Sequence, residues 1–222
     1  MEQFLSIADH MAVAVFAVTG ALMASRKQMD IFGFIMLGTV TGVGGGSLRD
    51  LLLGAPVFWI AAPGYIATCV VAASATFFLA HLAQSRYRVI LWLDAVGLAL
   101  FAVLGAEKTL ALGVSSIIAL VMGVMSATFG GIIRDVLGGE VPLLLRREIY
   151  VTAALAGAAV FVGLSVLGLS PLVAGVAAFI GGFGVRALAL TFGWSLPAYR
   201  SRPGRSQGEL EAMGILPSDE ER

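Results

Sequence analysis

The sequence has few charged residues and one cysteine. Aspartate, glutamate, lysine and arginine make up 13% of the 222 residues, whereas soluble globular proteins carry about a quarter. The 14 basic residues equal the 14 acidic residues in number, so no positive surface for nucleic acid is expected. Cys69 is the lone cysteine and cannot form a disulfide within the chain. These shortages exclude an ordinary soluble protein, a nucleic-acid-binding protein and an internal disulfide.

Motifs for catalysis and for metal binding are also missing. The sequence has no His-Glu-x-x-His zinc motif and no Walker A lysine. The run Gly42-Val43-Gly44-Gly45-Gly46-Ser47 departs from the dinucleotide-binding fingerprint because serine replaces its last glycine. His10 and His81 have no histidine or cysteine partner at metal-binding spacing. We therefore expect no enzyme, no cofactor and no bound metal.

Long hydrophobic segments dominate the chain instead. Hydrophobic residues make up 59% of the sequence, and the mean hydropathy is +0.94. A helix needs about twenty apolar residues to cross a membrane, and seven segments meet this need: about residues 4–24, 31–53, 64–83, 89–106, 112–137, 149–167 and 172–194. The sequence predicts an all-α integral membrane protein with seven transmembrane helices in one domain, residues 1–195. Residues 196–222 are polar and are expected to form a disordered tail.

Two similar halves follow one another at an offset of 85 residues. Asp9 aligns with Asp94, Phe16 with Phe101 and Tyr65 with Tyr150, without a gap. The most distinctive motif, Gly44-Gly45-Gly46-Ser47-Leu48-Arg49-Asp50, returns as Gly130-Gly131-Ile132-Ile133-Arg134-Asp135. We interpret the halves, about residues 4–84 and 89–168, as an internal duplication. Each half has three helices, an odd number, so the copies form a 3+3 inverted repeat. The helix at 172–194 stands outside the repeat.

Basic residues are concentrated in the loops on one side of the membrane: Arg26, Lys27, Arg86, Arg88, Arg146, Arg147 and the tail residues Arg200, Arg202 and Arg205. The positive-inside rule then predicts an external N-terminus and a cytoplasmic C-terminus. On the other side, Lys108 is expected to form a solvated loop pair with Glu107. Arg186, in the last helix, is expected to extend to the cytoplasmic surface.

The glycines of the repeated motif lie inside two predicted helices. A glycine costs about 1 kcal/mol relative to alanine in a helix interior. We therefore expect the second and fifth helices to be broken, by unwinding or by a kink, at Gly44, Gly45 and Gly46 and at Gly130 and Gly131. Discontinuous helices at matching positions of an inverted repeat mark a solute site near the membrane midplane. The alternative is that the glycines form a ridge of small residues for close helix packing.

Each motif ends with an arginine and an aspartate inside a membrane segment: Arg49-Asp50 and Arg134-Asp135. Such charges are costly in the membrane and are functional or paired by default. Adjacent residues of a helix point about 100° apart, so we expect the arginines to pair across helices, with Asp9 and Asp94 as candidate partners. One hypothesis places the arginines beside a conduction path as gating charges. The other treats the pairs as structural locks.

The doubled Gly-Gly-x-x-Arg-Asp motif in a seven-helix chain resembles the bacterial branch of the trimeric intracellular cation (TRIC) channel family, also described as a glycine-transporter domain family. The resemblance covers about residues 4–194. It implies a homotrimer in the lipid of the bacterial inner membrane, with a pore in each protomer. Its permeant ions would be monovalent cations, chiefly potassium, with sodium as an alternative. Gly44–Gly46 and Gly130–Gly131 would be pore kinks, and Arg49 and Arg134 would lie near the path.

Animal members of that family are controlled by a phosphoinositide that binds a lysine-rich motif. Such control is not expected here, because Leu51-Leu52-Leu53-Gly54 follows Asp50.

Three functions stay open. The first is a passive potassium-permeable channel with its pore between the two repeats. The second is a carrier for a small zwitterion such as glycine, with the carboxylate at a half-helix N-terminus or at an arginine. The third, a structural scaffold, leaves the paired charges unexplained.

Overall fold

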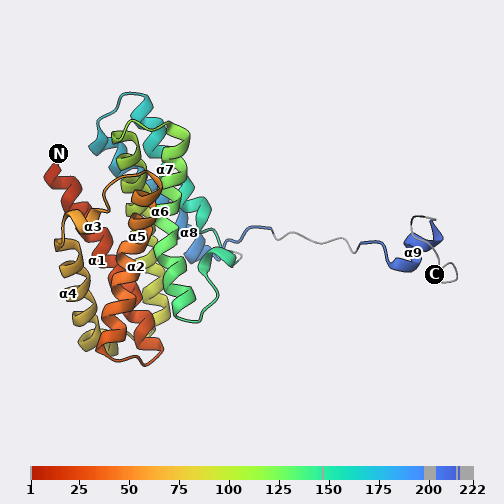
Figure 1. Cartoon of the computed structure of the whole chain (residues 1–222), viewed down its shortest axis with the longest axis horizontal. Helices are drawn as coiled ribbons and strands as arrows, with labels where there is room; N and C mark the ends of the chain where they lie inside the picture. Colours follow the sequence, from red (N-terminus) through yellow and green to blue (C-terminus); the bar gives the residue numbers. More distant parts are fainter. Residues whose placement is uncertain (1, 147, 198–203, 214, 216–222) are drawn as a thin grey trace.

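The computed structural model describes residues 2–146, 148–197, 204–213 and 215. Seven helices form a bundle (Figure 1): α1 (Glu2–Arg26), α2 (Ile31–Leu52), α4 (Gly64–Leu79), α5 (Arg86–Ala111), α6 (Ser116–Leu137), α7 (Val151–Val166) and α8 (Pro171–Phe192). Shorter elements are α3 (Phe58–Ala61), α9 (Gln207–Ala212) and the 3-10 helices η1 (Ala80–Leu82) and η2 (Leu143–Leu145). The described residues form no strand beyond one isolated bridge, so the all-α prediction is confirmed.

Six helices in the described part of the chain are long and apolar enough to cross a membrane. The predicted span at 149–167 is the exception, because Ile149 and Tyr150 belong to the loop before α7, which has 16 residues. This predicted span is thus present as a shorter apolar helix, which begins two residues later and ends one residue earlier than predicted. Helix α5 is longer than predicted and continues to Ala111, so Glu107 and Lys108 lie in a helix and not in a loop.

The two predicted copies have matching elements. Helix α2 begins at Ile31 and ends at Leu52, and α6 begins and ends 85 residues later, at Ser116 and Leu137. The turn after each helix contains a glycine with a φ of +63°, at Gly54 and Gly139, a conformation that glycine adopts without steric cost. The short helices α3 and η2 follow in turn. Two three-helix units with one additional helix, α8, are thus the observed architecture.

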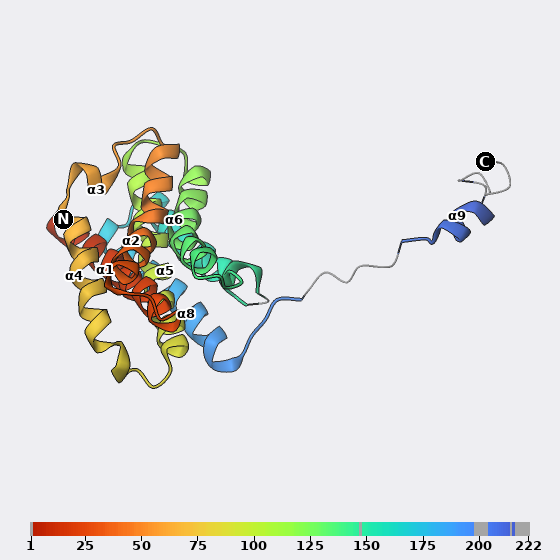
Figure 2. The ribbon, with the colours of Figure 1, turned by 60° about the horizontal axis from the view of Figure 1, so that its bottom comes forward.

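Helices α2 and α6 cross at their glycines. A β-carbon on Gly45 would lie 2.2 Å from the carbonyl oxygen of Ser126, and one on Gly130 would lie 2.5 Å from that of Thr41. Since Thr41 and Ser126 are also equivalent residues, the same contact occurs twice across the pseudo-two-fold axis. Figure 2 shows α2 and α6 within the bundle and α4 at its edge. The crossing therefore lies where the two repeats meet.

Both glycine runs lie in uninterrupted α-helix. The predicted break by unwinding at Gly44–Gly46 and Gly130–Gly131 is therefore wrong, whereas a kink there stays a prediction. The packing alternative describes the contacts of these glycines. Backbone groups in an apolar interior must keep their hydrogen bonds, which favours an intact helix over an unwound one. The missing side chains let the two backbones approach closely instead.

Aromatic residues also meet at the axis. Helix α1 packs on α5, and the ring of Phe16 contacts that of its equivalent, Phe101, with centroids 5.1 Å apart. A residue that contacts its own equivalent must lie next to the pseudo-two-fold axis. Two phenylalanine rings therefore fill the space beside the crossing of α2 and α6 with apolar material.

The predicted tail, residues 196–222, is described only in part. Its residues 207–212 form the short helix α9, and the disorder of the tail stays a prediction. Residues 198–203, 214 and 216–222 of the predicted tail lie outside the described residues.

The crossing predicts an unequal response to added methyl groups. The variants Gly45→Ala and Gly130→Ala each place a β-carbon against a carbonyl oxygen, and such overpacking costs about 1–3 kcal/mol. A matched control is Gly184→Ala in α8, where a β-carbon meets nothing within 4 Å and alanine favours the helix. Thermal unfolding in detergent should show a lower melting temperature for the first two variants only. Equal melting temperatures for all three would contradict the close contact.

Candidate functional site

The charges of the second copy form what we call the Arg134 cluster: Arg134, Asp135, Asp94 and Thr19. Arg134 donates from Nε to Asp135 Oδ1 at 2.9 Å, and from Nη1 to Asp94 Oδ1 at 2.6 Å and to Thr19 Oγ1 at 3.1 Å. The side chains of Arg134 and Asp94 have no exposed surface. Because these residues come from α6, α5 and α1, one buried cation joins three helices.

The charges of the first copy form the Arg49 cluster: Arg49, Asp50 and Lys108. Arg49 donates to Asp50 Oδ1 from Nε and from Nη2, each at 2.8 Å. The Nζ atom of Lys108, on α5, lies 2.9 Å from the same oxygen. Lys108 has no charged counterpart in the first half, because the residue 85 positions earlier is Met23. The two clusters therefore differ although their motifs are repeated.

Each motif aspartate also holds the short helix that follows it. Asp50 Oδ2 accepts a hydrogen bond from the backbone of Phe58 at 2.9 Å, and Asp135 Oδ2 accepts one from that of Leu143 at 3.0 Å. Phe58 and Leu143 are the first residues of α3 and η2. A carboxylate that accepts backbone N–H groups at a helix start acts as a cap. One oxygen of each aspartate thus binds arginine, and the other positions a loop.

The predicted pairing across helices is half correct. Arg134 pairs with Asp94 as expected, whereas no ion pair of the described residues joins Arg49 to Asp9. Asp9 stays within electrostatic reach of that arginine. The expectation that the arginines avoid the neighbouring aspartate is wrong in both copies. The long arginine side chain can curve back along the helix, so the 100° between adjacent Cα–Cβ directions does not separate the charged groups.

Sequence reasoning missed the ion pairs of three charged residues: Lys108, Glu148 and Arg186. Arg186 does not reach the surface as predicted, since it is 1% exposed. It donates from Nη2 to Glu148 Oε2 at 2.6 Å and from Nη1 to the carbonyl oxygen of Ile149 at 3.1 Å. An arginine in an apolar helix, together with a glutamate just before another helix, was the available signal.

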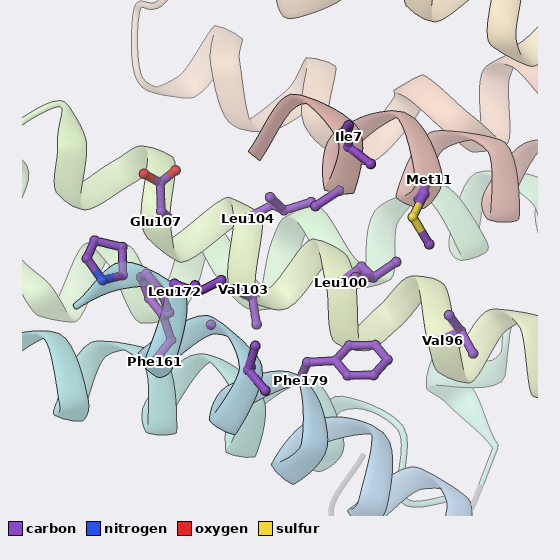
Figure 3. Close-up of a pocket in the computed structure, with 14 residues that line it drawn as sticks. Ile7, Met11, Val96, Leu100, Val103, Leu104, Glu107, Phe161, Leu172 and Phe179 are labelled. Carbon is purple, nitrogen blue, oxygen red and sulfur yellow. The ribbon is translucent and has the colours of Figure 1, made fainter. Parts of the chain in front are cut away.

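An apolar pocket of about 310 Å³ lies between α1, α5, α7 and α8. Figure 3 shows Ile7 and Met11 on one side, Phe179 on the other and Glu107 at one end. Glu107 is the only charged residue of the lining, which contains none of the repeated glycines, arginines or aspartates. Its chemistry suits a hydrocarbon chain and not an ion or a zwitterion, so the charge clusters stay the candidate site.

The fold and the two clusters define a class of protein, a multi-pass helical membrane protein built on an inverted repeat with paired charges in its interior. A family model described as "Glycine transporter" matches residues 6–81 and 91–166, two segments that begin 85 residues apart. The chain belongs to this family, which is the family of the TRIC channels. Membership in a family of channels also confirms the prediction that the chain is not an enzyme.

Relatives and solved structures support this assignment. The inner membrane protein YadS of Escherichia coli is 44% identical over 154 residues, which are 67% of this chain and 73% of YadS. A membrane protein of Vibrio cholerae is 44% identical over 69% of this chain, which spans 65% of that relative, slightly less than two thirds. The TRIC trimeric intracellular cation channel orthologue from Rhodobacter sphaeroides is 56% identical, with a TM-score of 0.84 over 86% of this chain and 99% of the orthologue. Another TRIC cation channel structure is 34% identical, with a TM-score of 0.80 over 90% of this chain and 98% of that channel's chain.

The asymmetry of the clusters predicts unequal costs for removing the two arginines. In Arg134→Met, Asp94 and Asp135 lose their cation, and an unpaired buried charge costs about 3–5 kcal/mol. In the matched variant Arg49→Met, Asp50 keeps Lys108, so a smaller loss is expected. Thermal unfolding of both purified variants measures the difference. Equal destabilisation would show that Lys108 does not compensate for Arg49.

A pH dependence is expected where the two halves meet at the basic end of the bundle. Glu140 accepts from Lys27 Nζ at 3.0 Å and from Arg26 Nη2 at 3.3 Å. The hydrogen bond from Lys27, and then the charge of Arg26, lower the pKa of Glu140 below its ordinary value of 4.5. Its contribution to stability is therefore present above pH 4.5 and is lost as the pH falls through the lower folded-state pKa. The melting temperatures of the wild type and Glu140→Gln should differ at neutral pH and converge in acid. A gap that persists in acid would contradict this assignment.

Proposed function

We propose that the chain is a cation channel of the bacterial inner membrane that conducts potassium and assembles as a homotrimer with one pore in each protomer. The observation that carries the proposal is the 56% identity and TM-score of 0.84 with a trimeric intracellular cation channel orthologue. That match covers 86% of this chain and 99% of the orthologue. Sodium is the alternative permeant ion.

Interior charge supports a preference for cations. The Arg49 cluster, together with Asp9 and Glu107, which lie within electrostatic reach of it, holds three carboxylates and two cations. The Arg134 cluster holds two carboxylates and one cation. Each cluster therefore carries an excess negative charge, which favours cations over anions in a low-dielectric interior. The arginines do not present free positive charge to the path, because each is paired.

In this proposal the pore runs between the two repeats, along α2 and α6 and past the two clusters. Gly44–Gly46 and Gly130–Gly131 form its narrow centre, where Phe16 and Phe101 add an apolar constriction. Hydrophobic constrictions gate channels by excluding water. Arg49, Asp50, Arg134 and Asp135 would then be gating charges whose pairs hold the closed arrangement. Opening requires the helices joined by the Lys108–Asp50 and Arg134–Asp94 ion pairs to separate.

The proposed orientation has an external N-terminus and a cytoplasmic C-terminus. Arg26 ends α1 and Arg146 follows η2, yet both guanidinium groups lie over the ring of Tyr87, at 5.2 and 5.7 Å from its centroid. The basic loops are thus gathered at one end of the bundle, while Lys108 lies at the other, beside Asp50. Such an arrangement is what the positive-inside rule requires.

A glycine carrier is the second candidate, because the matching family model is described as a glycine transporter. The discriminating measurement is single-channel recording of the purified protein in a planar bilayer under a potassium chloride gradient, with glycine flux into matched liposomes. We expect discrete openings that reverse near the potassium equilibrium potential and no saturable glycine uptake. Recordings without openings, together with saturable glycine uptake, would show that the protein is a carrier and not a channel.

The same recordings test the position of the pore. Phe101→Ala shortens the central constriction and should raise the open probability or the unit conductance. The matched control is Phe34→Ala, because Phe34 is also buried but packs against Phe77 and not beside the axis. Equal currents from the wild type and both variants would show that the conduction path does not run along the repeat axis.

A further inference from the structure

Three residues beside Gly131 each have a buried polar atom without a hydrogen-bond partner in the described part of the chain: Asp94 Oδ2, Arg134 Nη2 and Tyr150 Oη. Their residues are 0%, 0% and 1% exposed. Nearly all buried polar atoms in proteins are hydrogen-bonded, to protein or to ordered water. An unsatisfied group in an apolar interior is costly. Three such atoms in one place therefore call for a common partner.

The glycine itself provides the place. A β-carbon on Gly131 would lie 2.7 Å from Tyr150 Oη, 3.3 Å from Asp94 Oδ1 and 3.6 Å from Arg134 Nη2. All three side chains therefore border the same small region beside the glycine. At the equivalent Gly46, a β-carbon would also meet its nearest atom at 2.7 Å, but that atom belongs to the apolar ring of Phe58. The polar surroundings are a property of the second copy alone.

We infer that this region binds one ordered water molecule, held by Asp94, Arg134 and Tyr150. The chemistry of the three groups decides the ligand. Arg134 Nη2 can only donate, Asp94 Oδ2 can only accept, and the tyrosine hydroxyl can do either. A metal cation would face the guanidinium, and an anion would face the carboxylate, so each would be repelled by one partner. Water satisfies all three, and buried waters make about three hydrogen bonds.

Such a water extends the Arg134 cluster to α8. The guanidinium carbon of Arg186 lies over the ring of Tyr150, 5.3 Å from the ring centroid. Arg186 also binds Glu148 and the backbone of Ile149. The hydroxyl of Tyr150 then reaches the Arg134–Asp94 pair through the water. The helix outside the repeat becomes connected to the buried ion pair. The water site itself does not depend on whether the protein conducts cations.

The test is a set of crystal structures at a resolution that shows ordered water, for the wild type, Gly131→Ala and Gly46→Ala. Wild type and Gly46→Ala should show one peak within hydrogen-bonding distance of all three groups. Gly131→Ala should lack it, because its methyl group would lie 2.7 Å from Tyr150 Oη and crowd the region that the water needs. A second set of wild-type crystals, grown in rubidium chloride, uses anomalous scattering to separate a water from a monovalent cation. Absence of the peak in the wild type, or an anomalous rubidium signal there, would overturn the inference.

Tyr150→Phe keeps the test decisive if Gly131→Ala does not fold. This variant retains the ring beneath Arg186 and removes one of the three hydrogen bonds. We expect the water peak to weaken or to shift toward Asp94 and Arg134, with a lower melting temperature than the wild type. An unchanged peak and an unchanged melting temperature would show that the hydroxyl does not bind the water.

Discussion

The close contact of α2 and α6 is the constraint on which the other features depend. Two glycines, Gly45 and Gly130, let each helix backbone touch a carbonyl of the other. Because the contact is repeated about an axis, it fixes the two helices in opposite directions and sends their C-terminal ends to opposite ends of the bundle. Each C-terminal end carries an arginine and an aspartate, so the crossing also determines where the two buried charge clusters form.

Burial then determines how the charges are arranged. Removing an ion from water is costly unless it is paired and hydrogen-bonded. Arg134 meets this requirement with two carboxylates and a threonine, and Asp50 meets it with an arginine, a lysine and a backbone N–H. The same demand explains why Arg186 turns inward to Glu148 instead of extending to the surface. Paired charges hold helices together, so in a channel they resist the separation that opening requires.

The hydrophobic segments and the 85-residue offset were sufficient to predict the helical class, the inverted repeat and most helix bounds, because these follow from composition and periodicity. The Arg134–Asp94 pair was predicted from symmetry. Symmetry could not predict Lys108, which occupies a position that holds Met23 in the other copy. Helix propensity alone misjudged Gly44–Gly46 and Gly130–Gly131, since tertiary packing outweighs about 1 kcal/mol per glycine. The partner of a buried charge depends on which helices meet, and one sequence does not contain that information.

Inversion places equivalent residues in different compartments. The first motif lies at one face of the membrane and the second at the other, so the copies meet unlike pH, ion concentrations and lipid leaflets. Substitutions that suit one face need not suit the other, and the halves of a duplicated gene can then diverge without losing their shared backbone. Lys108, whose equivalent in the first copy is Met23, is such a divergence. The bundle therefore has two ends that are chemically distinct, although the backbones of its two halves match.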